Sequence, residues 1–400
     1  MTPSHERRGC DALLDAIKTA GVSRIFTLSG NHIMPVFDAA FDAGIPLIHT
    51  RHEAATVHMA DAFARITGEV GVALVTGGPG HANAVSALYT ALMAEAPVAL
   101  LSGHAPNAQL GKGAFQELRQ ADMAEPVCKA AWTCASADAL AGDFARAVRI
   151  ARSGRPGPVH LSLPTDVLEK SVGKAVDCAA GDFAAETIPL DPASATAIMA
   201  ALKSARRPVI LTGPSCMTRS GRARLAALQA ACGIPVVGMD SPRGIADPRL
   251  GAFAQVLAEA DAVLLLGKRL DFTLKFGQAP AIAAEALVFQ IDADVSEMER
   301  SRKALGSRLQ LTASADVASA VTALMATQAR GASNIDADWL AQFDAAVAWR
   351  PPAWQHASSA QTDRLHPVQM LRPLQAALDS HPDAVLVLSL IHISEPTRPY

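Results

Sequence analysis

The stretch Ile45–Pro97 constrains the fold of this chain more than any other. It reads IPLIHTRHEAATVHMADAFARITGEVGVALVTGGPGHANAVSALYTALMAEAP. A short apolar run predicts a strand, apolar residues at helical spacing predict a helix, and residues 70–75 predict a second, buried strand. Gly77–Gly80 then turn the chain into another helix. Glu53 lies where the first strand meets the first helix, the edge at which open α/β sheets bind ligands.

The same alternation of strands and helices runs through the rest of the chain. It predicts α/β architecture with doubly wound parallel-sheet domains. The predicted helices cover 10–20, 34–43, 137–153, 193–204, 222–231, 316–326 and 368–380. The other predicted strands cover 24–28, 98–102, 159–163, 208–211, 234–237, 262–266, 287–291, 309–312 and 384–388.

Changes in this pattern predict the domain boundaries. The expected order is a first domain over 1–168, a linker over 169–188, a second domain over 189–330, a linker over 331–364 and the start of a third domain over 365–388. Residues 389–400, SLIHISEPTRPY, resemble the translation of a sequencing adapter. We expect them to be foreign, and we expect the natural chain to continue beyond Leu388.

Composition excludes several classes of function. The net charge of −3 gives no electrostatic case for nucleic acid or an anionic membrane surface. No apolar run approaches the ~20 residues that span a bilayer, and the N-terminus lacks the apolar core of a signal peptide. The six cysteines form no CxxC pair. This usage indicates reduced thiols in a cytoplasmic protein.

Local motifs exclude three kinds of site. His52 and His58 are six residues apart, whereas the histidines of a helical zinc site need i, i+4 spacing, so no metal site is predicted. The glycine turn matches neither GxGxxG nor a P-loop, and no GxSxG elbow occurs. Glu53 by itself is compatible with an ordinary first-turn carboxylate favoured by the helix dipole.

Several motifs in order carry a family resemblance. RHEAATVHMADAFARITGEVGVALVTGGPGHANAVSAL is followed by PVALLSGHAP, GAFQE and ARSGRPGPVHLSLPTDV. Together these resemble the pyrimidine-binding domain of thiamine diphosphate enzymes, most of all the large subunit of acetolactate synthase and its relatives. The resemblance covers roughly residues 8 to 388. It implies a thiamine diphosphate-binding fold followed by a Rossmann-like central domain.

The resemblance gives Glu53 a chemical role. In the family a glutamate hydrogen-bonds the pyrimidine nitrogen N1′, so that the exocyclic amine reaches its imino form and removes the C2 proton. Glu53 matches that glutamate and would act as general acid/base towards thiamine diphosphate. The resemblance places Thr76, Pro79 and Asn83 in the pyrimidine pocket.

Further residues follow from the same resemblance. Phe115 and Gln116 should face the substrate, with Gln116 also catalytic, and Pro106 should lie near the entry channel. The implied reaction is decarboxylation of a small 2-keto acid followed by carboligation. The complete protein would be a homodimer or homotetramer.

The central domain would be a six-stranded nucleotide-binding unit. Arg155 matches an arginine that contacts FAD in acetolactate synthases. Gly267, Arg269 and Asp292 are candidate contacts to FAD or ADP, since a carboxylate after a strand can bind ribose hydroxyls. Asp292 is equally compatible with a helix N-cap.

Departures from the family pattern keep alternatives open. Thr165 stands where acetolactate synthases usually carry lysine, and GKRLDFTLKFG is closer to relatives acting on acyl-CoA compounds than to GARFDDR. A glycine- and histidine-containing FAD segment expected after Gly244 is missing. A 2-hydroxyacyl-CoA lyase or oxalyl-CoA decarboxylase relative is therefore the second reading, and a non-catalytic binding scaffold the third. The GDG…N motif that binds Mg²⁺ and the diphosphate is not found, so we expect these 400 residues to be inactive alone.

Overall fold

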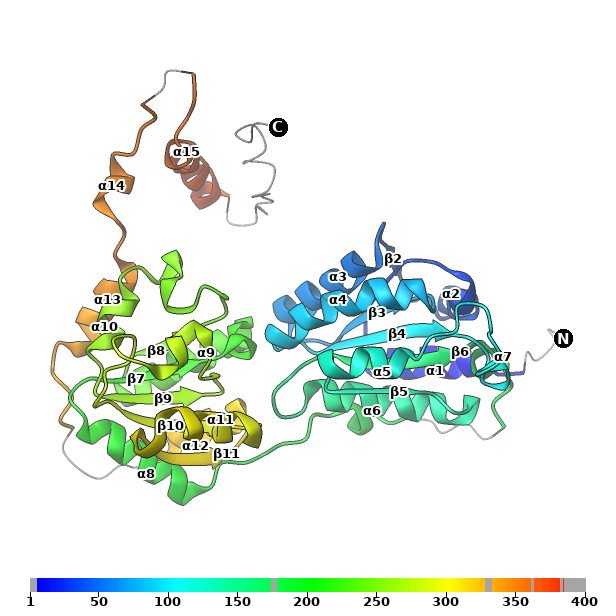
Figure 1. Ribbon diagram of the computed structural model, residues 1–400, viewed down its shortest axis with the longest axis horizontal. Coiled ribbons are helices and arrows are strands. Elements are labelled where there is room, and N and C mark those ends of the chain that lie inside the picture. The colour runs from blue at the N-terminus through cyan, green and yellow to red at the C-terminus, as the bar shows by residue number, and fades with distance from the viewer. Residues whose placement is uncertain (1–5, 174–177, 328–332, 361–362, 382–383, 385–400) are drawn as a thin grey trace. The chain divides into compact units, whose positions relative to one another are not determined.

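The described residues fall into two units. The computed structural model describes residues 6–173, 178–327, 333–360, 363–381 and 384 (Figure 1). The chain divides into Met1–Val347 and Ala348–Tyr400. The first unit holds two parallel sheets, which confirms the predicted doubly wound α/β class.

The first sheet has six strands in the order β2-β1-β3-β4-β6-β5, all paired in parallel. The strands are β1 Ile25–Thr27, β2 Leu47–His49, β3 Gly71–Val75, β4 Val98–His104, β5 Ala130–Thr133 and β6 Val159–Pro164. The helices around them are α1 Gly9–Thr19, α2 Met34–Ala43, α3 Glu53–Thr67, α4 Pro79–Met93, α5 Gln120–Ala124, α6 Leu140–Arg152 and α7 Thr165–Glu169. Strand β5 is not among the predicted strands.

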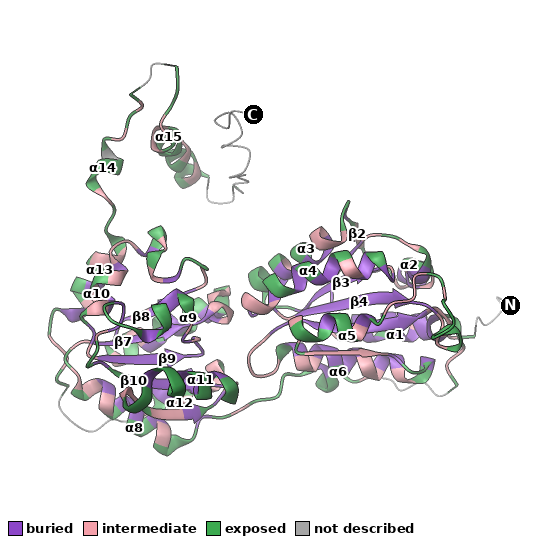
Figure 2. Cartoon of the chain, viewed as in Figure 1, coloured by how far each residue is buried: buried purple, intermediate pink, exposed green. Residues whose placement is uncertain are grey.

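Helices cover both faces of this sheet, as its apolar strands require. Successive side chains of a strand point to opposite faces. Leu74 accordingly packs with residues of α1, α2 and α6, whereas its neighbour Val75 packs with residues of α3 and α4. Both faces are therefore buried along strands β1, β3, β4 and β6, which Figure 2 shows in the colour of buried residues. The edge strands β2 and β5 are only partly buried.

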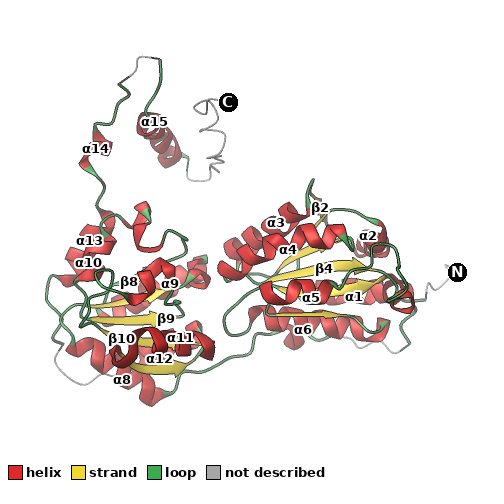
Figure 3. Cartoon of the chain, viewed as in Figure 1, coloured by secondary structure: helices red, strands yellow, loops and turns green. Residues whose placement is uncertain are grey.

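The second sheet has five strands in the order β11-β10-β9-β7-β8. The strands are β7 Pro208–Thr212, β8 Val236–Gly238, β9 Ala262–Leu266, β10 Leu287–Asp292 and β11 Leu309–Ser314. The accompanying helices are α8 Pro192–Ser204, α9 Arg219–Cys232, α10 Phe253–Ala258, α11 Val295–Leu305, α12 Val317–Ala326 and α13 Trp339–Ala348 (Figure 3). The expected six strands are wrong for the described residues, since helices and turns fill the remaining sequence.

Trp339 anchors α13 to the second sheet. Its side chain is fully buried, and its indole N–H donates to the carbonyl oxygen of Pro208 at 2.8 Å. Pro208 is the first residue of β7, so the bond ties the helix to the start of that strand. The indole edge lies against Phe343 in the same core.

The second unit contributes α14 Pro352–Gln355 and α15 Pro367–Ser380. Helix α15 matches the helix predicted over 368–380, and none of its residues is buried. The strand predicted over 384–388 lies outside the described residues apart from Ala384, as does the whole of 389–400. In the described parts of the chain, every helix is too short or too polar to cross a membrane.

Candidate functional site

The strand order of the first sheet places a crevice between β1 and β3. The chain leaves β1 for β2 on one side and returns to β3 on the other. Ligands of open α/β sheets bind at such a reversal, at the carboxyl ends of the strands. Gly30 follows β1 and Thr76 follows β3, and a Cβ atom on Gly30 would lie 2.4 Å from Cβ of Thr76. Only glycine fits there.

Glu53 stands at this edge as the first residue of α3. The His52 ring nitrogen Nδ1 caps the helix by accepting from the N–H of Ala54 at 3.1 Å. Oε2 of Glu53 accepts from the side-chain amide of Asn83 at 3.0 Å. Oε1 lies 3.4 Å from where a Cβ on Gly80 would stand. The carboxylate is half-buried and held against the glycine turn by a neighbour that was itself predicted to line the pocket.

The glycine turn is fixed from below by a buried glutamine. Gly78 has a left-handed backbone with φ +59°, and its N–H donates to Oε1 of Gln120 at 2.9 Å. Pro79 is the first residue of α4, where its missing N–H costs nothing. A Cβ on Gly78 would lie 2.7 Å from Cβ of Gln116, which is itself left-handed at φ +56°. The loop that carries Gln116 therefore rests directly on the turn.

Phe115 joins the site through His32. The two rings stack with centroids 5.8 Å apart, although the Phe115 side chain is 68% exposed. The His32 ring nitrogen Nδ1 lies 3.4 Å from Oγ1 of Thr76. Burial, together with the nearby His104, lowers the pKa of His32, so a neutral imidazole faces the crevice. Pro106 lies earlier in the same loop and is half-buried.

Glu117 shapes the loop that carries Phe115 and Gln116. Its carboxylate accepts from the backbone N–H groups of Gly111, Gly113 and Ala114 at 2.6, 3.1 and 3.0 Å. These hydrogen bonds lower the pKa of Glu117, although its side chain faces solvent. These three hydrogen bonds therefore fix the conformation of the loop from within.

A buried polar network lies under the glycine turn. Gln120 donates to Oγ of Ser162 at 3.2 Å, and that hydroxyl lies 3.4 Å from Nε2 of His160. The rings of His160 and His81 lie 4.5 Å apart, and Nδ1 of His81 is 2.9 Å from Oγ of Ser102. Burial lowers the pKa of His81 to about 4, and lowers that of His160 well below its usual value. Both histidines are neutral parts of the core.

The structure gathers three other predicted residues at a second place. The guanidinium of Arg155 pairs with the carboxylates of Glu95 and Asp292 and donates to the carbonyl of Gly267 at 3.1 Å. Arg269 does not join them, since it pairs with Glu297 at 3.3 Å. The four residues expected to form one nucleotide-binding site therefore belong to two separate groups of contacts, one around Arg155 and one at Arg269.

Three residues of these sites were not predicted from the sequence. His32 lies between the strand predicted over 24–28 and the helix predicted over 34–43, and could have been found as a polar side chain near a strand's carboxyl end. Gln120 gives no local signal, because its partners are 42 residues away or come from other strands. Glu95 gives no local signal either, because nothing in the sequence indicates its left-handed backbone at φ +55°.

The described residues show no cluster of three or more His, Cys, Asp or Glu side chains suited to a metal ion. His52 caps α3, and His58 is exposed on the same helix.

Comparison with known proteins identifies both sheets. Residues 7–123 match the family model of the thiamine pyrophosphate enzyme N-terminal TPP binding domain. Residues 195–324 match the model of the thiamine pyrophosphate enzyme central domain. The two models therefore match the regions that carry the Glu53 crevice and the five-stranded sheet.

Individual relatives carry two names. The acetolactate synthase large subunit of Parasynechococcus marenigrum is 32% identical over 316 residues, covering 74% of this chain and 51% of the relative. The 2-hydroxyacyl-CoA lyase 2 of Danio rerio is 31% identical over 335 residues, covering 73% and 53%. That of Caenorhabditis elegans is 27% identical over 431 residues, covering 96% and 65%. The chain spans about half the length of the first two. With both domain models matched in order, the chain belongs to the thiamine pyrophosphate enzyme family.

Proposed function

We propose that the crevice between β1 and β3 binds the aminopyrimidine of thiamine diphosphate, with the Glu53 carboxyl group on ring nitrogen N1′. The observation that carries this proposal is the position of Glu53, which Asn83 holds at 3.0 Å beside the glycine turn. A carboxyl group so placed can share or transfer a proton with a ring nitrogen. Half-burial limits competition from water.

The surroundings of Glu53 fit the cofactor. Glycines at 30, 78 and 80 leave room where side chains would collide, so a flat ring can approach the backbone. Thr76, Pro79 and Asn83 line the same edge. Bound thiamine diphosphate would supply the carbanion chemistry that cleaves the bond next to a substrate carbonyl. The protein's own part is to orient the ring and to hold the proton at N1′.

Phe115 and Gln116 would meet the substrate. Both lie on the loop that rests on Gly78, and Phe115 presents an exposed ring backed by His32. Pro106 would border the approach to them. For the whole protein we propose decarboxylation of a small 2-keto acid with carboligation, as in acetolactate synthases.

A second candidate is cleavage of 2-hydroxyacyl-CoA or decarboxylation of oxalyl-CoA. The segment Phe272–Gly277 supports it, because it departs from the acetolactate synthase pattern and presents two half-exposed rings, Phe272 and Phe276. Relatives named 2-hydroxyacyl-CoA lyase 2 support it equally.

The remaining assignments are proposals for the whole protein. We keep the boundaries 1–168, 189–330 and 365–388 for the three domains. The Mg²⁺ ligands and the diphosphate site would lie outside the described residues, and the active form would be a homodimer or homotetramer in the cytoplasm.

The decisive experiment compares two glutamine variants of the complete gene product. Glu53→Gln should lower turnover about 10²- to 10⁴-fold, because an amide cannot transfer the proton. Glu69→Gln, at the exposed end of the same helix region, should leave turnover unchanged. Rates would be measured with pyruvate and with a 2-hydroxyacyl-CoA. Full activity of Glu53→Gln would exclude its role, and inactivity of the wild type towards both substrates would favour a binding scaffold.

The 400-residue chain is tested separately. We expect calorimetry with thiamine diphosphate and Mg²⁺ to show no Mg²⁺-dependent binding, because the described residues contain no group of His, Cys, Asp or Glu side chains that could hold a metal ion. A Kd in the micromolar range, equivalent to about −8 kcal/mol, would contradict this expectation.

A further inference from the structure

The second sheet has a reversal of its own, between β7 and β9. The chain passes from β7 to the edge strand β8 and then returns to β9 on the opposite side. Gly213 follows β7 and Gly267 follows β9. A Cβ on Gly213 would lie 2.6 Å from the carbonyl oxygen of Gly267, so these two turns meet closely. By the general rule, a nucleotide phosphate would bind here, on the N–H groups of the turn after β7.

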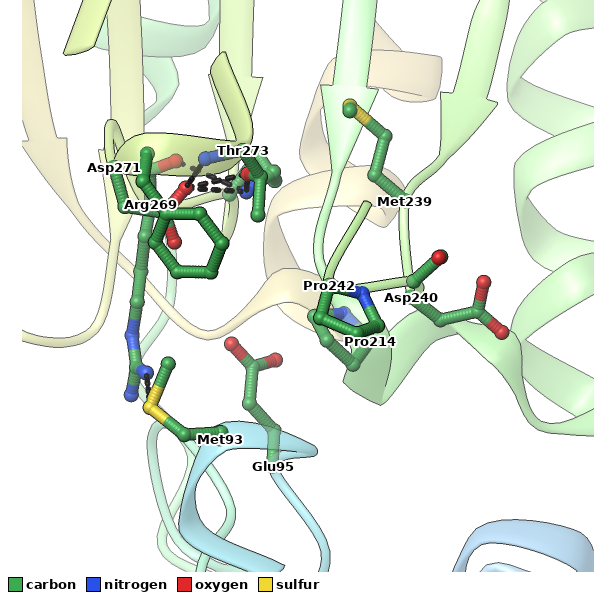
Figure 4. A pocket seen from close by; sticks show the side chains of 12 residues that line it. Met93, Glu95, Pro214, Met239, Asp240, Pro242, Arg269, Asp271 and Thr273 are labelled. Atoms are coloured by element: carbon green, nitrogen blue, oxygen red, sulfur yellow. Dashed lines mark hydrogen bonds and ion pairs between the residues drawn. The ribbon is translucent and has the colours of Figure 1, made fainter. Parts of the chain in front are cut away.

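Glu95, which comes from the end of α4, already occupies these donors. Its Oε2 accepts from the N–H of Ser215 at 3.1 Å, within the turn after β7. Its two carboxylate oxygens lie 3.1 and 3.3 Å from where a Cβ on Gly213 would stand. Figure 4 shows the Glu95 side chain pointing towards the turn that carries Pro214. The carboxylate therefore holds the position in which a phosphate oxygen would accept hydrogen bonds.

Two buried cations near this carboxylate, Arg155 and Lys268, are also engaged. Arg155, whose side chain is 10% exposed, pairs with Glu95 and Asp292. Burial opposes its charge, but the two carboxylates together raise the pKa of Arg155. The buried Lys268 donates to Oγ1 of Thr273 at 2.7 Å and lies 3.4 Å from Asp271. A phosphate group entering beside Arg155 and Lys268 would meet the buried carboxylates of Glu95 and Asp292, and like charges at such distances repel.

The backbone of Glu95 is a second, independent observation. Helix α4 has Ala94 as its C-cap, so Glu95 occupies the following position, where a left-handed residue is usually glycine. Glu95 has φ +55° and is 3% exposed. A left-handed non-glycine residue costs of order 1 kcal/mol or more. Strain of this kind persists where the surrounding contacts compensate for it. At Glu95 these contacts are the backbone N–H bond to the carbonyl of Leu92 at 3.3 Å and the hydrogen bond and ion pair of the side chain.

From these observations we propose that Glu95 is a built-in substitute for a bound phosphate, so that the central domain of this chain binds neither FAD nor ADP. Arg155 then connects the two sheets through its ion pairs with Glu95 and Asp292 and its hydrogen bond to the carbonyl oxygen of Gly267. We call this group of contacts the ionic joint. FAD and ADP do not fit, because the N–H of Ser215 and the guanidinium of Arg155, which would donate to their phosphates, already bind the Glu95 carboxylate. The proposal concerns the second sheet and is independent of the role of Glu53.

The first test is a titration of the wild-type chain with ADP and with FAD. Calorimetry up to about 1 mM ligand should detect no binding, and neither ligand should raise the melting temperature. Binding of either nucleotide with a Kd below about 100 μM would overturn the proposal. This measurement needs no variant and stands whether or not the enzyme is active.

The second test removes the Glu95 carboxylate from the turn after β7. Glu95→Gly retains the left-handed backbone, which glycine adopts without strain, and removes the carboxylate. Inorganic phosphate should raise the melting temperature of this variant but not that of the wild type, because phosphate can then reach Ser215 and Arg155. Asp240→Asn is the control, since Asp240 lines the same cavity but pairs with Arg249.

Two results of the phosphate experiment would contradict the proposal. If phosphate stabilises the wild type, the control and Glu95→Gly equally, it binds elsewhere and the proposal fails. If phosphate has no effect on Glu95→Gly, Glu95 is not standing in for a phosphate. Should that variant not fold, Glu95→Gln keeps the side-chain volume and removes the charge, and the same two readings apply to it.

Discussion

Gly78 and Gln116 meet with left-handed backbones on both sides. The 2.7 Å approach means that neither residue tolerates a larger neighbour. The loop that carries Gln116 therefore occupies part of the space beside Gly78, and any ligand at the crevice has to accommodate this loop.

Substitution of Gly78 tests this contact. Gly78→Ala should lower the free energy of unfolding by about 1 kcal/mol for the left-handed backbone, and by a further 1–3 kcal/mol for the collision with Gln116. Gly21→Ala is the matched control, because Gly21 is also left-handed, at φ +78°, but has nothing within 4 Å of its Cβ position. Urea denaturation measures both. Equal losses would mean that the loop yields without cost.

At the scale of elements, the buried strands follow directly from the sequence. Strand β9 was predicted with its observed bounds, because a parallel strand covered on both faces is one aliphatic run between polar ends. Strand β5 was missed. It is a half-buried edge strand, AAWT, and it pairs only with β6, so it lacks the run that marks its neighbours.

The sites around Glu53 and Glu95 also differ in how far the sequence predicts them. The family resemblance predicted Glu53 and Asn83 for one pocket, and the structure brings them together from helices α3 and α4. Glu95 and Ser215 are 120 positions apart and belong to different sheets. No spacing or periodicity in the sequence carries that contact, which exists only once the sheets have packed.

The paired histidines of α4 and β6 predict an acid-sensitive core. The pKa of His81 falls from 6.5 to about 4, so the folded state binds fewer protons than the unfolded state in this range. The free energy of unfolding should therefore decrease as the pH falls below 6.5, by about 3 kcal/mol at pH 4 for His81 alone. Above pH 6.5 this contribution is fully present.

Urea denaturation between about pH 7 and pH 4 checks the prediction. His81→Phe should flatten the pH dependence even if it is less stable at neutral pH, because it removes one proton-binding group. His58→Asn should not, since His58 is exposed on α3. An unchanged slope in His81→Phe would show that other groups govern acid unfolding.

For the whole molecule, the ionic joint at Arg155 connects the sheets of the first unit. Arg155→Met should lower the free energy of unfolding by about 3–5 kcal/mol, because Glu95 and Asp292 would remain buried without a cation. Arg152→Met, three residues earlier and exposed, should change it by less than about 0.5 kcal/mol. A loss below about 1 kcal/mol for Arg155→Met would show that the joint contributes little.

Trp339 has a consequence for spectroscopy. The chain has four tryptophans, of which Trp349 and Trp354 are 46% and 42% exposed, whereas Trp339 is sealed beneath β7. A collisional quencher such as acrylamide would reduce the fluorescence of the two exposed indoles and leave the fluorescence of Trp339 largely unchanged. With the half-buried Trp132 replaced by Phe, the surviving emission would come from the second sheet alone. The protein thus contains its own optical reporter for one of its two sheets.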